Sequence, residues 1–98
     1  MAQFQVYLLA KDRLVLDLQT DLIDTGSRVV APLFPKSRGP SPIGRIEPEF
    51  AIAGVPHVLH TAEMAAIPSG MLNGPPVADL TEFDYEIRRA LDMVFTGF

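Results

Sequence analysis

The chain has 98 residues, 48% of them hydrophobic, and a formal net charge of -4 from 12 acidic and 8 basic residues. This length predicts one small domain over residues 1–98 with a modest core. The absence of cysteine excludes disulfides, cysteine nucleophiles and thiolate zinc sites. The acidic balance argues against broad nucleic-acid binding, because such binding depends on neutralising phosphates.

The sequence also carries no sign of membrane insertion or export. No stretch approaches the run of about 20 apolar residues that a membrane helix needs. The N-terminal residues 1–5 lack the basic region of a signal peptide. We therefore expect a soluble, cytoplasmic protein that makes no contact with a membrane.

Apolar residues recur with a period of two in the first third of the chain, which is typical of β-strands. Residues 4–9 and 14–19 predict two strands, and the short polar break between them indicates an antiparallel hairpin. A third strand is expected over residues 28–33. Pro32 and Pro35 should end this strand, because proline has no N–H to donate to a sheet.

Proline and glycine dominate the middle of the chain. Five of the nine prolines fall in or just before residues 34–48, which therefore predict a proline-rich, irregular loop within the domain. Two more strands are expected over residues 50–53 and 58–62, with residues 54–56 as the turn between them. Residues 64–67 fit either a helical turn or the start of a strand.

The last segment changes to spacings of three and four residues, which place its apolar side chains on one face of a helix. These side chains are Phe83, Ile87, Ala90, Leu91, Val94 and Phe98. Thr81 should cap the helix in a box-like arrangement with Asp84, and Gly97 should end it in a left-handed conformation. The predicted fold class is mainly β, an antiparallel sheet or barrel of about five or more strands with one C-terminal α-helix.

The polar residues form no recognisable catalytic or metal-binding motif. His57 and His60 lie at an odd spacing on an expected strand, so they should face opposite sides and be ordinary surface or half-buried histidines. No serine lies in a Gly-x-Ser-x-Gly elbow. Asp17, Asp21 and Asp24 lack the spacing of a calcium loop and are interpreted as strand-edge and turn residues. We therefore expect no catalytic site, no cofactor and no metal.

Several short strings are more informative when they are taken in order. They are Gln3–Tyr7, Leu16–Thr25, Arg28–Leu33, Met64–Pro68, Val77–Leu80 and Glu86–Phe98. With these strings at these separations, the chain resembles the CcdB family, the toxins of plasmid and chromosomal toxin–antitoxin modules. The resemblance extends nearly end to end and is weakest in the proline-rich loop.

This resemblance implies an SH3-like antiparallel β core with a C-terminal helix, a homodimer and a function without enzymatic chemistry. Toxins of the family bind the A subunit of DNA gyrase and trap the gyrase–DNA cleavage complex. A CcdA-like antitoxin neutralises them through a disordered C-terminal segment. The expected partners are therefore a second copy of the chain, gyrase and a cognate antitoxin, without direct specific binding to nucleic acid.

The resemblance also places the gyrase-binding residues, in one turn and at the end of the last helix. The turn Asp21–Asp24 matches the family's pattern of aspartate, aliphatic residue, isoleucine and aspartate. Three helix positions correspond to asparagines of the family's best-known pattern, and Thr96 corresponds to its tryptophan. The expected binding residues are Leu22, Ile23, Asp24, Tyr85, Arg89, Asp92, Thr96, Gly97 and Phe98.

Two apolar pairs lie among or beside these residues. Leu22 and Ile23 are adjacent, so in an extended stretch one of them points outward, which favours a binding surface. Phe95 and Phe98 fit either core or dimer packing or contact with a partner.

Two other functions remain open at this point. Toxins of the MazF type share the barrel and cleave RNA, a reaction that needs a base, an acid and a phosphate-binding cation in one groove. Arg28, Arg38, Arg45 and the two histidines could contribute to such a groove. The second alternative is a degenerate relative that binds an antitoxin without poisoning gyrase, which Thr96 favours.

Overall fold

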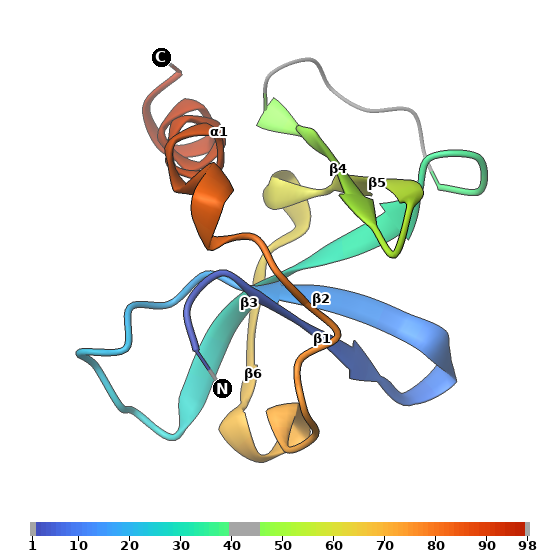
Figure 1. Ribbon diagram of the computed structural model, residues 1–98. Coiled ribbons are helices and arrows are strands. Elements are labelled where there is room, and N and C mark those ends of the chain that lie inside the picture. Colours follow the sequence, from blue (N-terminus) through green and yellow to red (C-terminus); the bar gives the residue numbers. More distant parts are fainter. Residues whose placement is uncertain (1, 40–45, 98) are drawn as a thin grey trace.

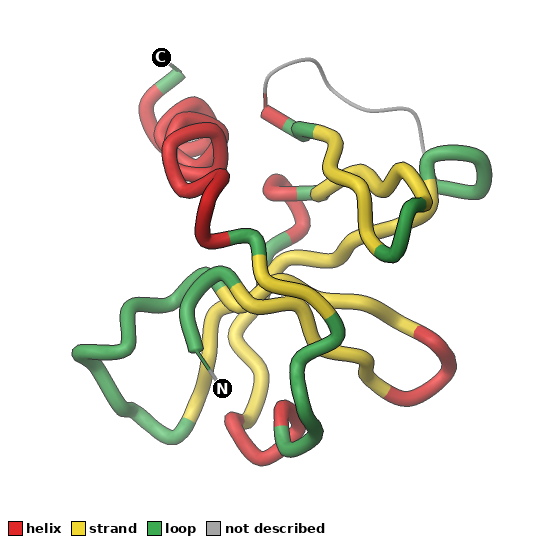
Figure 2. Tube along the Cα trace, in the orientation of Figure 1, coloured by secondary structure: helices red, strands yellow, loops and turns green. Residues whose placement is uncertain are grey.

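The computed structural model describes residues 2–39 and 46–97 of the chain. This part of the chain folds into seven antiparallel strands, several short 3-10 turns and one C-terminal helix (Figures 1 and 2). The strands are β1 (Gln5–Leu9), β2 (Arg13–Asp17), β3 (Ser27–Pro35), β4 (Glu49–Ile52), β5 (Val55–Leu59), β6 (Ala65–Pro68) and β7 (Ala78–Asp79).

The strands form a nearly closed barrel around the long strand β3. The order across the sheet is β4-β5-β3-β2-β1-β7, and β6 pairs with β3 outside this path. One edge of β3 pairs with β2, while its other edge pairs first with β6 and then with β5. The predicted hairpin of β1 and β2 is confirmed, with Val6 opposite Leu16. The predicted mainly β class with a C-terminal helix is therefore confirmed.

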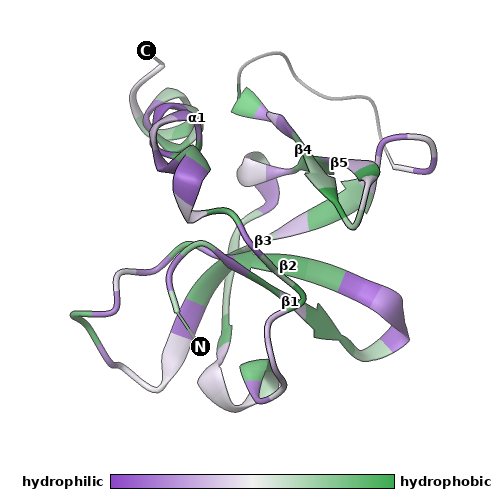
Figure 3. Ribbon diagram, viewed as in Figure 1, coloured by the Kyte–Doolittle hydropathy of each residue, from purple (hydrophilic) through white to green (hydrophobic). Residues whose placement is uncertain are grey.

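Two apolar clusters cover the two faces of the strands. Val6, Leu16 and Leu33 belong to the main core, which also receives Ile87 from the helix. Tyr7, Val15, Val30 and Leu72 form a smaller cluster. Successive side chains of a strand point to opposite faces, so neighbours such as Val15 and Leu16 are both buried. Figure 3 shows the resulting green stretches along the strands.

The prediction that Pro32 ends the third strand is wrong, because β3 runs on to Pro35. The Pro32 carbonyl accepts a hydrogen bond of 2.9 Å from the His60 N–H. The nitrogen and the carbonyl of one strand residue face the same side. The N–H that Pro32 lacks would therefore point to the place where the partner of β3 changes from β6 to β5. The first two residues of the predicted 34–48 loop thus belong to β3, and residues 40–45 lie outside the described residues.

The predicted turn over residues 54–56 is also wrong, because the hairpin between β4 and β5 is tighter. Ile52 pairs with Val55, and only Ala53 and Gly54 connect them, with φ angles of 51° and 79°. Two left-handed residues in a two-residue loop make a turn whose twist matches that of the strands. Strand β5 therefore starts at Val55 and includes Pro56.

The segment after β5 settles the open assignment of residues 64–67. Strand β5 ends at Leu59, and η3 (Thr61–Glu63) replaces the end of the strand expected over residues 58–62. Strand β6 then begins at Ala65, so residues 64–67 lead into a strand.

The terminal helix α1 spans Asp84–Thr96 and follows the 3-10 turn η5 (Thr81–Phe83). The predicted cap at Thr81 is wrong, because the N-cap residue is Phe83 and makes no side-chain capping bond. Instead, the Thr81 backbone N–H and hydroxyl both donate to the Asp79 carboxylate. The predicted end is confirmed, since Gly97 is left-handed with φ of 81° and its N–H bonds the Met93 carbonyl.

Candidate partner-binding surfaces

The loop between β2 and β3 carries two adjacent apolar side chains into solvent. The Leu22 side chain is 93% exposed and Ile23 is 52% exposed. We call this pair the loop tip. Figure 3 shows the tip in green on a loop that projects from the barrel, between hydrophilic neighbours. Adjacent exposed aliphatic residues on a projecting loop are typical of an interaction surface.

Polar contacts fix the root of this loop and leave its tip free. The Gln19 side chain donates to the Ile23 carbonyl at 3.0 Å and accepts from the Val29 N–H at 3.1 Å. The Asp21 carboxylate accepts from the Gln3 N–H at 3.0 Å. The Asp24 carboxylate accepts from the Gly26 N–H at 3.1 Å, which closes the turn before β3. The backbone under the loop tip is therefore held in one arrangement.

A buried ion pair anchors the same root to the barrel. The Arg28 guanidinium lies 2.9 Å from the Asp17 carboxylate, and these side chains are 8% and 0% exposed. Arg28 also contacts the Asp21 carboxylate at 3.0 Å and donates to the Gln19 carbonyl at 2.9 Å. The interpretation of Asp17 as a strand-edge residue is therefore wrong. Two charges eleven residues apart pair only after β2 and β3 align, which no spacing rule could have indicated.

The electrostatics of this pair reflect both burial and pairing. Burial raises the pKa of the Asp17 carboxyl, although Arg28 and the Gln19 N–H act to lower it. Burial acts to lower the pKa of the Arg28 guanidinium, but its hydrogen bonds to Asp17 and Asp21 outweigh this and raise it. Arg28 therefore stays charged and paired within the protein. It is not available as the phosphate-binding cation that MazF-type RNA cleavage would need.

The helix contributes a polar row on its outer face. Tyr85, Arg89, Asp92 and Thr96 recur at spacings of three and four residues, so they share one side of α1. We call these four residues the helix row, and all are exposed. The Arg89 guanidinium lies over the Tyr85 ring, 5.8 Å from its centroid, and also donates to the Tyr85 hydroxyl at 3.3 Å. The Thr96 hydroxyl donates back to the Asp92 carbonyl at 2.6 Å.

The end of the helix adds an aromatic side chain to this surface. Phe95 is 72% exposed, so the structure favours a surface role for this residue over core packing. The predicted site residue Phe98 lies outside the described residues. Within residues 2–39 and 46–97, no hydrogen bond or ion pair joins the loop tip to the helix row. The loop between β2 and β3 and the helix α1 both lie in the left half of the view in Figure 1.

The histidines differ from the expectation of ordinary surface or half-buried residues, because both are buried. His60 donates from Nδ1 to the Glu47 carboxylate at 3.0 Å, and Glu63 lies 3.6 Å from the same nitrogen. One ligand atom from each of these three residues lies within 4.8 Å of the others, so the set could hold a metal ion. Its members come together through the fold, and we interpret the buried His60–Glu47 bond as structural.

Comparison with known proteins identifies the family of the chain. The sequence matches the family model described as CcdB protein over residues 3–97. The chain belongs to the CcdB family. This is a family of toxins of toxin–antitoxin systems, and the resemblance found in the sequence is thereby confirmed.

A solved structure with the same architecture is toxin MazF-mt6 of Mycobacterium tuberculosis. It superposes with a TM-score of 0.69 over 93% of each chain, at 22% sequence identity. At this identity the likeness establishes the fold alone. The chain and MazF-mt6 thus share their overall fold. This likeness carries no conclusion about the side chains on their surfaces. Within the described ranges, no helix is both long and apolar enough to cross a lipid bilayer.

Within the described part of the chain, the residues that the CcdB-family resemblance singled out lie on the two surfaces above. The expected residues at the loop tip are exposed on a fixed root, and those of the helix row lie on one helix face. The polar anchoring by Asp17, Arg28 and Gln19 was not foreseen from the sequence. Predicting this anchoring would have required knowledge of contacts between residues that are far apart in the sequence.

Proposed function

We propose that this CcdB-family chain acts as a homodimeric toxin that binds the A subunit of DNA gyrase and traps the gyrase–DNA cleavage complex. A cognate CcdA-like antitoxin neutralises it. The action is one of binding, without enzymatic chemistry. The observation that carries the proposal is the loop tip, where Leu22 and Ile23 stand exposed above a root locked by hydrogen bonds and an ion pair.

The fixed conformation of the loop favours binding by preorganisation. A loop held in one conformation loses little conformational freedom when a partner closes over it, so more of the contact energy appears as affinity. Two adjacent aliphatic side chains offer apolar area that water leaves on binding. The helix row supplies polar groups and a tyrosine for the rim of the same interface, since aromatic residues and arginine are enriched at interfaces.

The end of the helix decides how strongly such an interface can form. Thr96 stands where the family's best-known pattern has tryptophan, and threonine lacks the flat aromatic surface that makes tryptophan a frequent hot spot. Phe95, exposed on the preceding position, provides an aromatic surface close by. The proposal therefore assigns the main apolar contact to the loop tip and a smaller one to the helix end.

The direct test is a supercoiling and DNA-cleavage assay with purified gyrase and the purified chain. We expect inhibition of supercoiling and accumulation of cleaved DNA, both abolished by addition of a cognate CcdA-like antitoxin. The double variant Leu22→Ser/Ile23→Ser should weaken gyrase binding by about 30-fold or more, as expected for hot-spot residues.

The matched control is Val55→Ser, which removes a similarly exposed apolar side chain from the β4–β5 hairpin. It should inhibit gyrase like the unaltered chain. Normal supercoiling beside a large excess of the folded chain would contradict the proposal and favour the degenerate relative. Cleavage of single-stranded RNA in a parallel reaction would favour the MazF-type alternative.

A further inference from the structure

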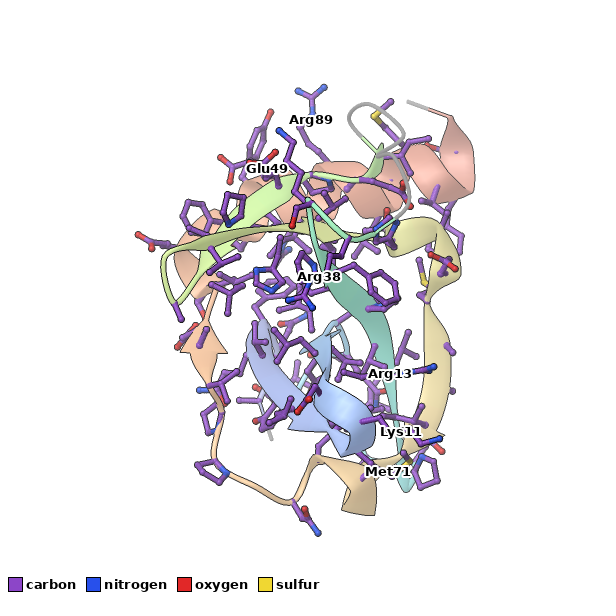
Figure 4. The ribbon with its side chains drawn as sticks, turned by 90° about the vertical axis from the view of Figure 1, so that its right-hand side faces the viewer. Lys11, Arg13, Arg38, Glu49, Met71 and Arg89 are labelled. Carbon is purple, nitrogen blue, oxygen red and sulfur yellow. The ribbon has the colours of Figure 1, made fainter. Side chains whose placement is uncertain are left out.

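A groove of about 630 Å³ lies beside the turn between β1 and β2. It shares no residue with the loop tip or the helix row. Its walls come from the start of β2, the end of β3, the turn that follows β3, and β5. Figure 4 views the molecule from this side, with Lys11, Arg13 and Arg38 labelled. We call this feature the cationic groove and define it by these three residues and His57.

The charges of the cationic groove set it apart from the rest of the chain. Seven of the eight lysines and arginines lie in the described part, Arg45 being outside it. Four of the seven have a partner there: Arg28 pairs with Asp17 and Asp21, Lys36 with Glu49, Arg88 with Asp84, and Arg89 contacts Tyr85.

The three cations without a partner among the described residues are the ones that line the groove. Lys11, Arg13 and Arg38 make no side-chain hydrogen bond or ion pair in residues 2–39 and 46–97. Asp12 is the one acidic residue of the lining. Within the described residues, the three cations that make no side-chain hydrogen bond or ion pair therefore line one concave site, where low-dielectric walls strengthen the local field.

The backbone that carries Lys11 and Arg38 is constrained on both sides of the groove. Lys11 and Asp12 both adopt left-handed conformations, with φ of 63° and 59°, which residues with a side chain adopt only when the surrounding structure imposes them. The turn of Arg38 is closed by bonds of 3.0 and 2.9 Å from the Arg38 and Gly39 N–H groups to the Pro35 carbonyl. Gly39 packs so closely on Phe34 that an added Cβ would lie 2.7 Å from the Phe34 Cβ.

The remaining lining favours a phosphate over a simple carboxylate. A phosphate group carries up to two charges and three acceptor oxygens, so it can engage several separate donors, and arginine forks match its geometry. The His57 Nδ1 donates to the Val55 carbonyl at 2.8 Å, so Nε2 of the neutral ring is an acceptor that suits an N–H or O–H of the organic part of the ligand. Leu14, Leu33 and Phe34 give the groove an apolar wall.

From these observations we infer that the cationic groove binds the phosphate group of a small phosphorylated molecule of nucleotide size. Lys11, Arg13 and Arg38 would neutralise and hold the phosphate, and the apolar wall would contact the organic part. This function is separate from the proposed gyrase binding, because the two use different residues. It is also distinct from broad nucleic-acid binding, which the net charge of the chain opposes.

The test follows amide chemical shifts of the folded chain during titration with inorganic phosphate, 5′-AMP, adenosine, a short single-stranded RNA and a hexaglutamate peptide. We expect shifts around residues 11–14 and 38 with phosphate, 5′-AMP and RNA, and none with adenosine. Tighter binding of 5′-AMP than of phosphate would show that the nucleoside contacts the apolar wall, as the inference requires. Tighter binding of RNA than of 5′-AMP would overturn the assignment to a small molecule, because the phosphate would then belong to a nucleic-acid backbone.

Variants make the assignment specific. Arg38→Gln and Lys11→Gln should each weaken 5′-AMP binding by about tenfold, as expected for one hydrogen bond to a charged group. Arg88→Gln on α1 removes the same formal charge outside the groove and should bind like the unaltered chain. Gyrase inhibition by Arg38→Gln should be unchanged, so failure of this inference is distinguishable from failure of the proposed function.

Three further results would overturn the inference. One is the absence of shifts at millimolar phosphate and 5′-AMP. The second is equal affinity of the chain and the Arg38→Gln variant for 5′-AMP. The third is binding of adenosine or hexaglutamate as tight as that of 5′-AMP, since the groove would then recognise a base or an acidic peptide instead of phosphate.

Discussion

Asp17 and Arg28 join the barrel to the loop that carries the loop tip. Removing a charged pair from water is costly, and the cost is recovered only where good geometry and further hydrogen bonds satisfy both charges. Here the guanidinium meets Asp17, Asp21 and the Gln19 carbonyl together. At the scale of single residues, this network explains how a loop with two exposed apolar side chains keeps one conformation.

The first prediction concerns this buried pair. Asp17→Asn should lower the free energy of unfolding by about 3–5 kcal/mol, because it leaves the Arg28 charge buried with only part of its pairing. The double variant Asp17→Asn/Arg28→Met should recover much of this loss. Urea unfolding followed by circular dichroism measures both, with the exposed Asp24→Asn as control. A double variant no more stable than Asp17→Asn would contradict the argument.

A second prediction at this scale concerns the pKa of Asp79. Hydrogen bonds from the Thr81 hydroxyl and N–H lower the pKa of the Asp79 carboxyl below its ordinary value of 3.8. The unfolded chain therefore binds the proton more readily, so this contribution to stability is present above the ordinary pKa and lost as pH falls through the folded one. Thr81→Val should raise the pKa of Asp79, as a carboxyl NMR titration would detect.

The control for this titration is Thr81→Ser, which keeps the hydroxyl and should leave the Asp79 pKa low. The stability difference between Thr81→Val and the unaltered chain should be full at neutral pH and should disappear in strong acid. An Asp79 pKa that is the same in all three proteins would show that the hydroxyl bond is not formed in solution.

At the scale of elements, α1 is held to the barrel by a narrow apolar face. Ile87 and Ala90 are fully buried, and Leu91 packs against the main core. The opposite face bears the helix row, so the same spacing that packs the helix also presents its polar residues outward. The position of the helix row therefore depends on Ile87.

The third prediction tests this packing. Ile87→Ala should destabilise the fold by about 2–5 kcal/mol, because it leaves a cavity where the helix meets the core. Glu86→Ala, on the neighbouring exposed position, should change stability by less than about 0.5 kcal/mol. Thermal unfolding measures both. Equal melting temperatures for the two variants would mean that α1 does not pack on the barrel as described.

The elements that the sequence predicted well are those with local causes. The period of two over residues 4–9 and 14–19 reflects side chains that alternate between faces, and the left-handed Gly97 follows from the geometry of a helix end. The exposed turn was predicted in part, since one of Leu22 and Ile23 was expected to point outward and both are exposed. Each of these depends on positions close together in the chain.

The elements that the sequence missed have causes far along the chain. Pro32 stays within β3 only because its missing N–H falls where the neighbouring strand changes. His60 is buried because Glu47, thirteen residues away, accepts its N–H. The cationic groove combines residues from the β1–β2 turn, the end of β3 and β5. Such meetings depend on strand order and register, which local periodicity does not determine.

At the scale of the whole molecule, the barrel separates its surfaces. The loop tip, the helix row and the cationic groove each combine a rigid base in the strands or helix with side chains that project into solvent. Figure 1 places the loop and the helix toward one side, and the β1–β2 turn toward the other. A partner on the loop tip and helix row would therefore leave the cationic groove open.

The last prediction asks whether the helix end belongs to the gyrase surface. Thr96→Trp should strengthen gyrase inhibition by about 30-fold, because a buried aromatic anchor at an interface contributes on the order of 2 kcal/mol. Thr96→Ala removes the hydroxyl bond to the Asp92 carbonyl without adding a ring, and should change inhibition little. Equal inhibition by Thr96→Trp and Thr96→Ala would place residue 96 outside the interface and leave the loop tip as its apolar contact.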